Sequence, residues 1–262
     1  MAKRVPPNEA QPVVQRLRCR YTKTGRMRFA SHRDFQRSLE RAIRRADVPI
    51  AYSGGFSPRP RISYANAAPT GAASHAEYIE LGLRTAVDPQ LLTEVVSRAL
   101  PDGFDIVEAI PAGGGKLADQ LHVSHWQLEL FGSEPAELDS ALAVLLAARP
   151  VVFTRITKSG RKDVDLSSAW VSHTVSSGST APGQTCAILR VVVQHQIPAV
   201  RPDDILSVLV ERTDLDPPTT ALITRLAQGP LRESSGFPGD PLARDKDVDE
   251  QAFGSAAADP PT

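Results

Sequence analysis

Residues 31–49 read SHRDFQRSLERAIRRADVP, and this stretch decides the fold because it is the clearest helix in the chain. Ser31 can cap the start of the helix, and Asp34 follows three residues later, which is the pattern of a capping box. Apolar residues at helical spacing predict a buried stripe of Phe35, Leu39, Ala42, Ile43 and Ala46. On the side nearly opposite Phe35 fall Arg33, Arg37 and Arg44, with Arg41 beside them. The stretch therefore predicts a helix with one apolar face and one arginine face.

Strands are predicted on both sides of this helix. Before it, side chains alternate in character over residues 13–23, which predicts a half-buried strand that turns at Gly25. After it come short strands at 48–52, 61–67 and 76–84, an amphipathic helix at 88–100 and a strand at 104–110. An order of strand, helix, two strands, helix and strand is that of the ferredoxin-like split βαβ arrangement. Residues 13–112 are therefore expected to form a first ferredoxin-like half of an α+β protein.

The pattern partly recurs in the rest of the chain. Residues 121–228 predict a second, degenerate ferredoxin-like half with several strands, helices at 134–148 and 201–213, and no clear last strand. Residues 113–120 are expected to be a linker, and residues 1–12 a flexible N-terminus. From 229 to 262 the chain is rich in Pro, Gly, Ser, Ala and Asp, which predicts a disordered acidic tail.

Charge is unevenly distributed along the chain. The 262 residues carry no net charge, yet the first 64 hold fifteen basic and four acidic side chains, a net charge of +11. An asymmetry of this size points to a polyanion or a membrane surface as partner. The simpler interpretation is a solvated basic face together with an acidic tail.

Composition excludes several classes of protein. No run of 18 apolar residues is present, so no membrane span is expected. Of the two partners that the charge favours, the polyanion is preferred and no membrane partner is expected. The first twelve residues lack an apolar signal region, which favours the cytoplasm. Two cysteines, Cys19 and Cys186, are too few for a disulfide framework or for the three thiolates of a radical SAM iron–sulfur cluster.

Two short motifs carry little weight. The stretch GGGKL at 113–117 has Leu117 where a phosphate loop needs Ser or Thr, so a linker is the better interpretation. His122 and His125 lie three apart on a predicted strand and face opposite sides, so they cannot share a metal ion. No metal and no cofactor are expected.

His32 is the one candidate catalytic residue. It follows the predicted cap Ser31 at a helix start, where free N–H groups and the helix dipole attract anions. It can bind phosphate or act as a general base, or it can be a plain surface histidine.

The stretch from Tyr52 to Tyr64, YSGGFSPRPRISY, is the second candidate site. Its glycines permit close backbone approach, its prolines stiffen the chain, and its arginines and aromatic rings suit phosphate contacts and base stacking. The topology predicts that His32 and Arg59 or Arg61 edge one cleft, with Glu77 holding an arginine in place. The alternative is a proline-braced turn with Phe56 in the core.

Residues 13–110 closely resemble the radical SAM-linked family, a bacterial family without an established reaction. Its motifs recur as Lys23, Gly25, Phe29, Ser31, His32 and Asp34, then Ala51, Tyr52, Ser53, Gly55, Phe56, Ser57, Pro58 and Pro60, then Ala76, Glu77 and Tyr78. The family often has His where Arg59 stands. The resemblance implies a stand-alone form and a possible radical SAM protein as partner.

Three functions are consistent with the sequence. The first is a non-catalytic accessory protein that binds RNA or another phosphate-bearing ligand. The second is an RNA-processing or RNA-modifying enzyme that uses His32, and the third is a docking module for a protein partner. The candidate binding residues are His32, Arg33, Arg37, Arg41, Arg44, Tyr52, Ser53, Gly54, Gly55, Phe56, Arg59, Arg61 and Glu77.

Overall fold

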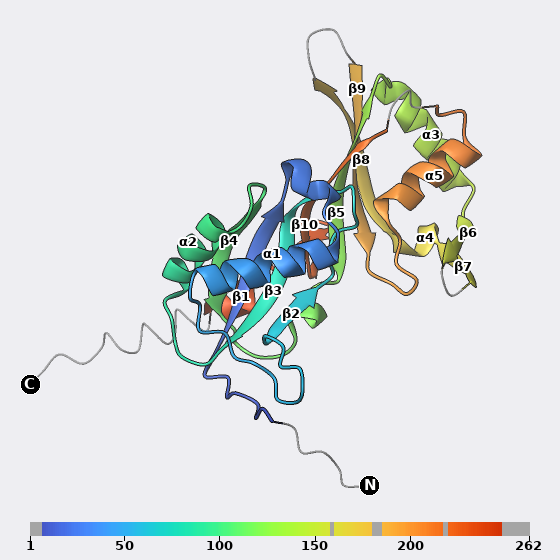
Figure 1. The fold of residues 1–262 in the computed structure, drawn as a ribbon. Coiled ribbons are helices and arrows are strands. Elements are labelled where there is room, and N and C mark those ends of the chain that lie inside the picture. The colour runs from blue at the N-terminus through green and yellow to red at the C-terminus, as the bar shows by residue number, and fades with distance from the viewer. Residues whose placement is uncertain (1–6, 158–159, 180–184, 217–219, 248–262) are drawn as a thin grey trace, which may run out of the picture. The chain divides into compact units, whose positions relative to one another are not determined.

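The computed structural model describes residues 7–157, 160–179, 185–216 and 220–247. Contacts divide the chain into two compact units, one formed by Met1–Gln120 with Pro241–Thr262 and the other by Leu121–Asp240. Both units combine helices with antiparallel strands (Figure 1), so the predicted α+β class is confirmed. Within the described ranges, no helix has the length and apolar character needed to cross a membrane.

The first unit is built around α1, the helix predicted from residues 31–49. Its elements are β1 (Gln15–Lys23), η1 (Gly25–Phe29), α1 (His32–Arg45), β2 (Ile62–Ala65), β3 (Ala73–Leu83), α2 (Pro89–Ala99), β4 (Phe104–Pro111) and η2 (Leu117–Gln120). The strands pair antiparallel in the order β4-β1-β3-β2. Residues 48–52, predicted as a strand, make only isolated bridges at Ile50 and Tyr52.

The two faces of this sheet have different roles. On β1, the apolar side chains of Leu17, Cys19 and Tyr21 are buried in the core with the inward faces of α1 and α2. The ring of Tyr21 stacks on Phe35 of α1 with centroids 4.1 Å apart. Arginines alternate with these residues along the strand, and because side chains alternate across a strand, they lie on the face away from the helices.

The C-terminal residues correct the prediction of a disordered tail from residue 229. Residues 231–238 form a small hairpin of β11 (Leu231–Arg232) and β12 (Phe237–Pro238) in the second unit. Residues 243–247 form a helical turn of the first unit, preceded by the fully buried Leu242. The average composition of this segment is polar, which is why disorder was predicted. The segment is nevertheless ordered, because it buries the side chains of Leu242 and one acid. Residues 248–262 of the predicted tail lie outside the described residues.

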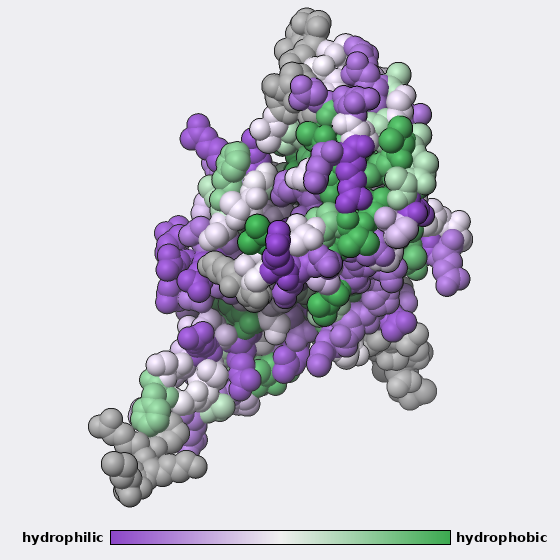
Figure 2. Space-filling view, turned by 90° about the vertical axis from the view of Figure 1, so that its right-hand side faces the viewer, coloured by the Kyte–Doolittle hydropathy of each residue, from purple (hydrophilic) through white to green (hydrophobic). Residues whose placement is uncertain are grey.

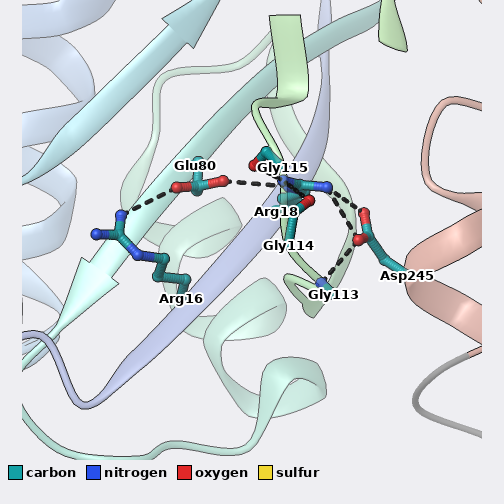
Figure 3. Close-up of polar contacts among 7 residues, drawn as sticks. All are labelled: Arg16, Arg18, Glu80, Gly113, Gly114, Gly115 and Asp245. Carbon is teal, nitrogen blue, oxygen red and sulfur yellow. Dashed lines mark hydrogen bonds and ion pairs between the residues drawn. The ribbon is translucent and has the colours of Figure 1, made fainter. Parts of the chain in front are cut away.

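The buried acid is Asp245, which is bound by Arg18 of β1 (Figure 3). The Nη1 group of Arg18 donates to the two Asp245 oxygens at 2.9 and 2.8 Å, and the backbone N–H of Gly113 donates at 2.7 Å. The Nη2 group donates to the carbonyl oxygens of Gly114 at 2.9 Å and Gly115 at 2.7 Å. The predicted linker at 113–120 is therefore an ordered loop, because a buried guanidinium fixes its backbone.

The N-terminal residues are also ordered where they are described. Asn8 forms a bridge with Gly55, and Gln11 and Tyr52 exchange hydrogen bonds of 3.0 Å. The predicted flexibility of residues 1–12 is thus wrong for 8–11, because this segment pairs with the loop at 52–55. Residues 1–6 lie outside the described part of the chain.

The second unit contains four strands that pair antiparallel with one another, together with a separate hairpin. Its elements are β5 (Val123–Phe131), α3 (Pro135–Ala147), β6 (Val152–Thr157), β7 (Gly160–Asp165), α4 (Leu166–Ala169), β8 (Trp170–Ser179), β9 (Thr185–Gln194), α5 (Pro202–Arg212), β10 (Leu222–Gly229), β11 and β12. The strand order is β10-β5-β9-β8, and β6 pairs with β7.

This unit contains a last strand that the sequence analysis did not predict. Strand β10 carries Arg225 in its middle, and a charged residue there weakens the apolar pattern. Arg225 is only 1% exposed and lies over the Trp126 ring, 5.1 Å from its centroid. Between β7 and β8 the chain forms the short helix α4, which Asp165 caps.

Candidate nucleic-acid interface

The two faces of α1 agree with the helical spacing of its sequence. Phe35, Leu39, Ala42 and Ile43 are buried, whereas Arg33, Arg37, Arg41 and Arg44 are exposed. The predicted capping box is present, since the Ser31 hydroxyl accepts from the Asp34 N–H and the Asp34 carboxylate accepts from the Ser31 N–H. The arginines therefore project from a helix whose start and buried face are both fixed.

The positive charge of this face is largely uncompensated. Within the described residues, Arg33, Arg37 and Arg44 make no ion pair, and Glu40, one turn before Arg44 on the helix, does not pair with it. Arg41 donates only to the Ser38 hydroxyl, at 3.2 Å. These guanidinium groups are available to an anionic ligand.

The turn η1 extends the basic surface beyond the start of α1. Arg26 is exposed, and the guanidinium of Arg28 lies over the ring of Phe29 at 4.6 Å. Phe29 is 59% exposed, which is unusual for a large aromatic side chain. An exposed ring among cations can stack on a base, and the sequence analysis did not single it out as a binding residue.

His32 lies at the start of α1 and contacts Tyr64. Their rings meet edge to face with centroids 4.9 Å apart, and the imidazole lies 3.0 Å from the Gln36 amide. Burial and the nearby Lys23 lower the pKa of His32, while Glu77 acts in the opposite direction. The lowered pKa favours the neutral imidazole, which can donate one hydrogen bond and accept another.

Glu77 does not have the role that the sequence analysis expected. Its carboxylate is 1% exposed and accepts the backbone N–H of Ala68 at 2.9 Å. Arg59 and Arg61, the arginines it was expected to hold, are exposed and form no ion pair with it. Glu77 instead contributes to the electrostatic surroundings of His32.

The candidate loop is divided between two ends of the sheet. The ring of Tyr64, the last residue of the loop, contacts the ring of His32. Two residues earlier, Ile62 pairs with Leu81 of β3, and Arg61 packs beside Gly82. No hydrogen bond or ring contact joins His32 to Arg59 or Arg61 within the described residues, and the shared cleft stays a prediction.

The loop itself is closed by its own backbone. The N–H of Ser53 donates to the Arg59 carbonyl at 2.9 Å, and the N–H of Arg59 donates to the Ser53 hydroxyl at 3.0 Å. Gly54 lies so close to Ala10 that a Cβ there would stand 2.9 Å from the Ala10 nitrogen. Phe56 is 61% exposed, so it is not the core anchor of the alternative interpretation.

A cavity of about 340 Å³ brings Arg44 and Tyr52 together near the end of α1. Arg84, Gln11 and Asp47 also line it. Two guanidinium groups beside an aromatic ring suit a phosphate attached to a base. The sequence analysis did not predict Arg84 and Gln11 as site residues. They lie 40 and 33 residues from Arg44, and a local sequence pattern does not show that the fold brings these residues together.

Comparisons of the fold with solved structures carry no functional argument. An unknown protein from Galdieria sulphuraria has 14% identity over 80% of this chain and 98% of its own, with a TM-score of 0.22. The DyP-type peroxidase of Mycobacterium smegmatis has 10% identity over 85% and 94%, also with a TM-score of 0.22. A putative DyP-type peroxidase from Shewanella oneidensis has 10% identity over 86% and 95%, with a TM-score of 0.21.

Sequence comparison identifies the family. No curated protein matches the chain. Residues 16–202, which are more than half of the chain and include β1, α1 and the loop at 52–64, match one bacterial family throughout. The chain belongs to the family described as "Uncharacterized protein conserved in bacteria (DUF2344)".

Proposed function

We propose that this protein binds RNA through the arginine face of α1 and does not act on it chemically. The observation that carries the proposal is that Arg33, Arg37 and Arg44 are exposed on one helix and form no ion pair within the described chain. Arginine binds phosphate with a planar fork of donors and remains charged at any physiological pH. The exposed Phe29 and the cavity beside Tyr52 supply aromatic rings at both ends of this face.

The strand orders support this choice of ligand at the level of fold. We infer that each unit is a ferredoxin-like module, because β4-β1-β3-β2 and β10-β5-β9-β8 both follow the order of a split βαβ arrangement. In the second unit this requires β5, β8, β9 and β10 to be the four strands, with β6, β7 and α4 as an insertion. Fold alone does not define a ligand, so the charge of α1 remains the main support.

Fluorescence anisotropy with a labelled twelve-nucleotide RNA tests the proposal. Replacing Arg33, Arg37 and Arg44 by Gln should weaken binding about tenfold, if each exposed contact contributes about 0.5 kcal/mol. The thermal melting curve should not change, because none of the three side chains is buried. Equal affinity of the variant and the parent would show that the face is merely solvated.

A matched control removes the same charge elsewhere. Arg98, Arg149 and Arg161 are exposed and have no ion pair within the described residues. Their combined replacement by Gln should leave RNA affinity within about twofold, apart from a general effect of net charge. An equal loss in both triple variants would show that binding depends on overall charge and not on α1.

A second candidate function is docking of a protein partner by the second unit. Several apolar side chains there are exposed, and Figure 2 shows green hydrophobic surface among hydrophilic residues on the face that it draws. Val152 and Ile156, which are 42% and 79% exposed, lie on the same side of β6. Together with α5 they line a hollow of about 620 Å³.

A radical SAM protein is the partner that the family resemblance favours. Cys19 and Cys186 are both buried, and burial raises the pKa of the Cys19 thiol to about 12. An iron–sulfur cluster would therefore belong to the partner. Mixing the chain with a purified radical SAM protein of the same bacterium should give a complex in size-exclusion chromatography, and Ile156→Asp should abolish it. Separate elution of the parent proteins would contradict this candidate.

A further inference from the structure

A cavity of about 480 Å³ lies in the first unit, against the sheet face that is away from α1. Arg16 and Glu80 line it, and they alternate along β1 and β3 with the core residues Leu17 and Ile79. The rest of its wall is formed by residues 63–65 of β2, the glycine loop with Lys116, and the first residues of η2. The volume is in the range of small-molecule sites, and the cavity is separate from the arginine face of α1.

Arg18 determines which way the glycine loop faces. Its guanidinium is 2% exposed, and its Nη2 group draws in the carbonyl oxygens of both Gly114 and Gly115 (Figure 3). In a planar trans peptide, the N–H of the next residue points away from that carbonyl. The N–H groups of Gly115 and Lys116 therefore point away from Arg18, and they make no hydrogen bond within the described residues.

The charges around the cavity favour an anion. Glu80 is the one acid among its lining residues, and each of its oxygens already accepts from an arginine, Arg16 at 3.0 Å and Arg18 at 3.1 Å. Lys116 is exposed at the cavity and has no ion pair within the described part of the chain. Arg16 is half exposed and donates only Nη1 to Glu80, so its other N–H groups remain available.

We propose that this cavity binds a small phosphate monoester, with its phosphate held by Lys116, Arg16 and the N–H groups of Gly115 and Lys116. Backbone N–H groups of glycine-rich loops and a nearby lysine are a recurring combination for phosphate. Ala65 and Leu117 supply apolar wall for the organic part of the ligand. The site differs from a nucleotide phosphate loop, because here a buried arginine, and not a following helix, orients the backbone.

Isothermal titration with AMP, ribose 5-phosphate and adenosine tests this proposal. AMP and ribose 5-phosphate should bind saturably, and adenosine, which lacks the phosphate, should not. Lys116→Gln should weaken AMP binding about tenfold, the loss expected for one charge-assisted hydrogen bond. Arg98→Gln, which removes an exposed arginine of α2, is the matched control and should leave binding unchanged.

The result separates this site from the RNA interface. A variant with only Arg33 and Arg37 replaced by Gln keeps Arg44 and the cavity beside Tyr52. It should bind AMP like the parent, even where its RNA affinity falls. Absence of AMP binding at millimolar concentration, equal binding of adenosine, or unchanged affinity of Lys116→Gln would each overturn the proposal. None of these outcomes bears on RNA binding by α1.

Discussion

Removing the carboxylate of Asp245 should strongly destabilise the first unit. Asp245 and Arg18 are 3% and 2% exposed, so Asp245→Ala leaves a buried cation without its main partner. Breaking a buried pair in this way costs about 3–5 kcal/mol. Arg18 keeps Glu80 and two carbonyl partners, so we expect the lower limit, about 3 kcal/mol. For a unit of this size that corresponds to a fall in Tm of roughly 10 °C.

Thermal and urea unfolding followed by circular dichroism measure the effect. The control is Asp247→Ala, which removes an exposed acid from the same helical turn and should change Tm by about 1 °C or less. A double variant, Arg18→Met with Asp245→Ala, should lose less stability than the sum of the two single variants, because each single change already removes the Arg18–Asp245 pair. If Asp245→Ala unfolds at the same temperature as Asp247→Ala, the C-terminal turn does not fasten the first unit and our reasoning is wrong.

Three further changes test the packing and the buried histidines. Leu242→Ala should cost about 3 kcal/mol in urea unfolding, because the side chain is fully buried in the C-terminal segment; a loss below about 1 kcal/mol would contradict its place in the core. Gly103→Ala should lower Tm by roughly 10 °C, because its φ is +95° and the new Cβ would stand 2.6 Å from the Thr24 carbonyl oxygen; an unchanged Tm would mean that the turn relaxes without cost. Burial lowers the pKa of His125 and His195, so the unfolded chain binds more protons than the folded chain near pH 6. The Tm should therefore fall as the pH drops below about 6.5. A Tm that stays constant from about pH 8 to about pH 5.5 would contradict this expected loss of stability.

The elements that sequence predicts well are those whose pattern is local. The helix α1 is defined by a capping box and a 3.6-residue stripe, and both survive folding because Phe35 and Leu39 have the core of the sheet to pack against. The exposure of its arginines follows from the same periodicity. The arginine face of α1, which is the main part of the proposed interface, could therefore be predicted without a structure.

The elements that sequence misses depend on contacts between distant residues. Asp245 lies 227 residues from Arg18, and no local pattern marks it as different from the other acids of the C-terminal region. Arg225 is in a strand because the ring of Trp126, from another strand, covers it. The sequence likewise does not show that Tyr52 lies beside Arg44 near the end of α1, because the chain between them does not form a regular strand.

The same pairing explains why net charge overstates the basic surface. Of the arginines that give the first 64 residues their charge, Arg16, Arg18 and Arg20 on β1 are paired with Glu80, Asp245 and Glu108. The four arginines of the arginine face of α1, Arg33, Arg37, Arg41 and Arg44, are not paired in this way, so about four phosphates should be engaged in the RNA complex. Since each phosphate on a single strand contributes about 0.7 to the salt dependence, log Kobs against log salt should have a slope of about −3. Replacing Arg33, Arg37 and Arg44 by Gln should bring the slope close to −1. A slope of about −8 for the parent would mean instead that all eleven net charges of the first 64 residues contact phosphate. The ion pairs of Arg16, Arg18 and Arg20 would then have to open on binding.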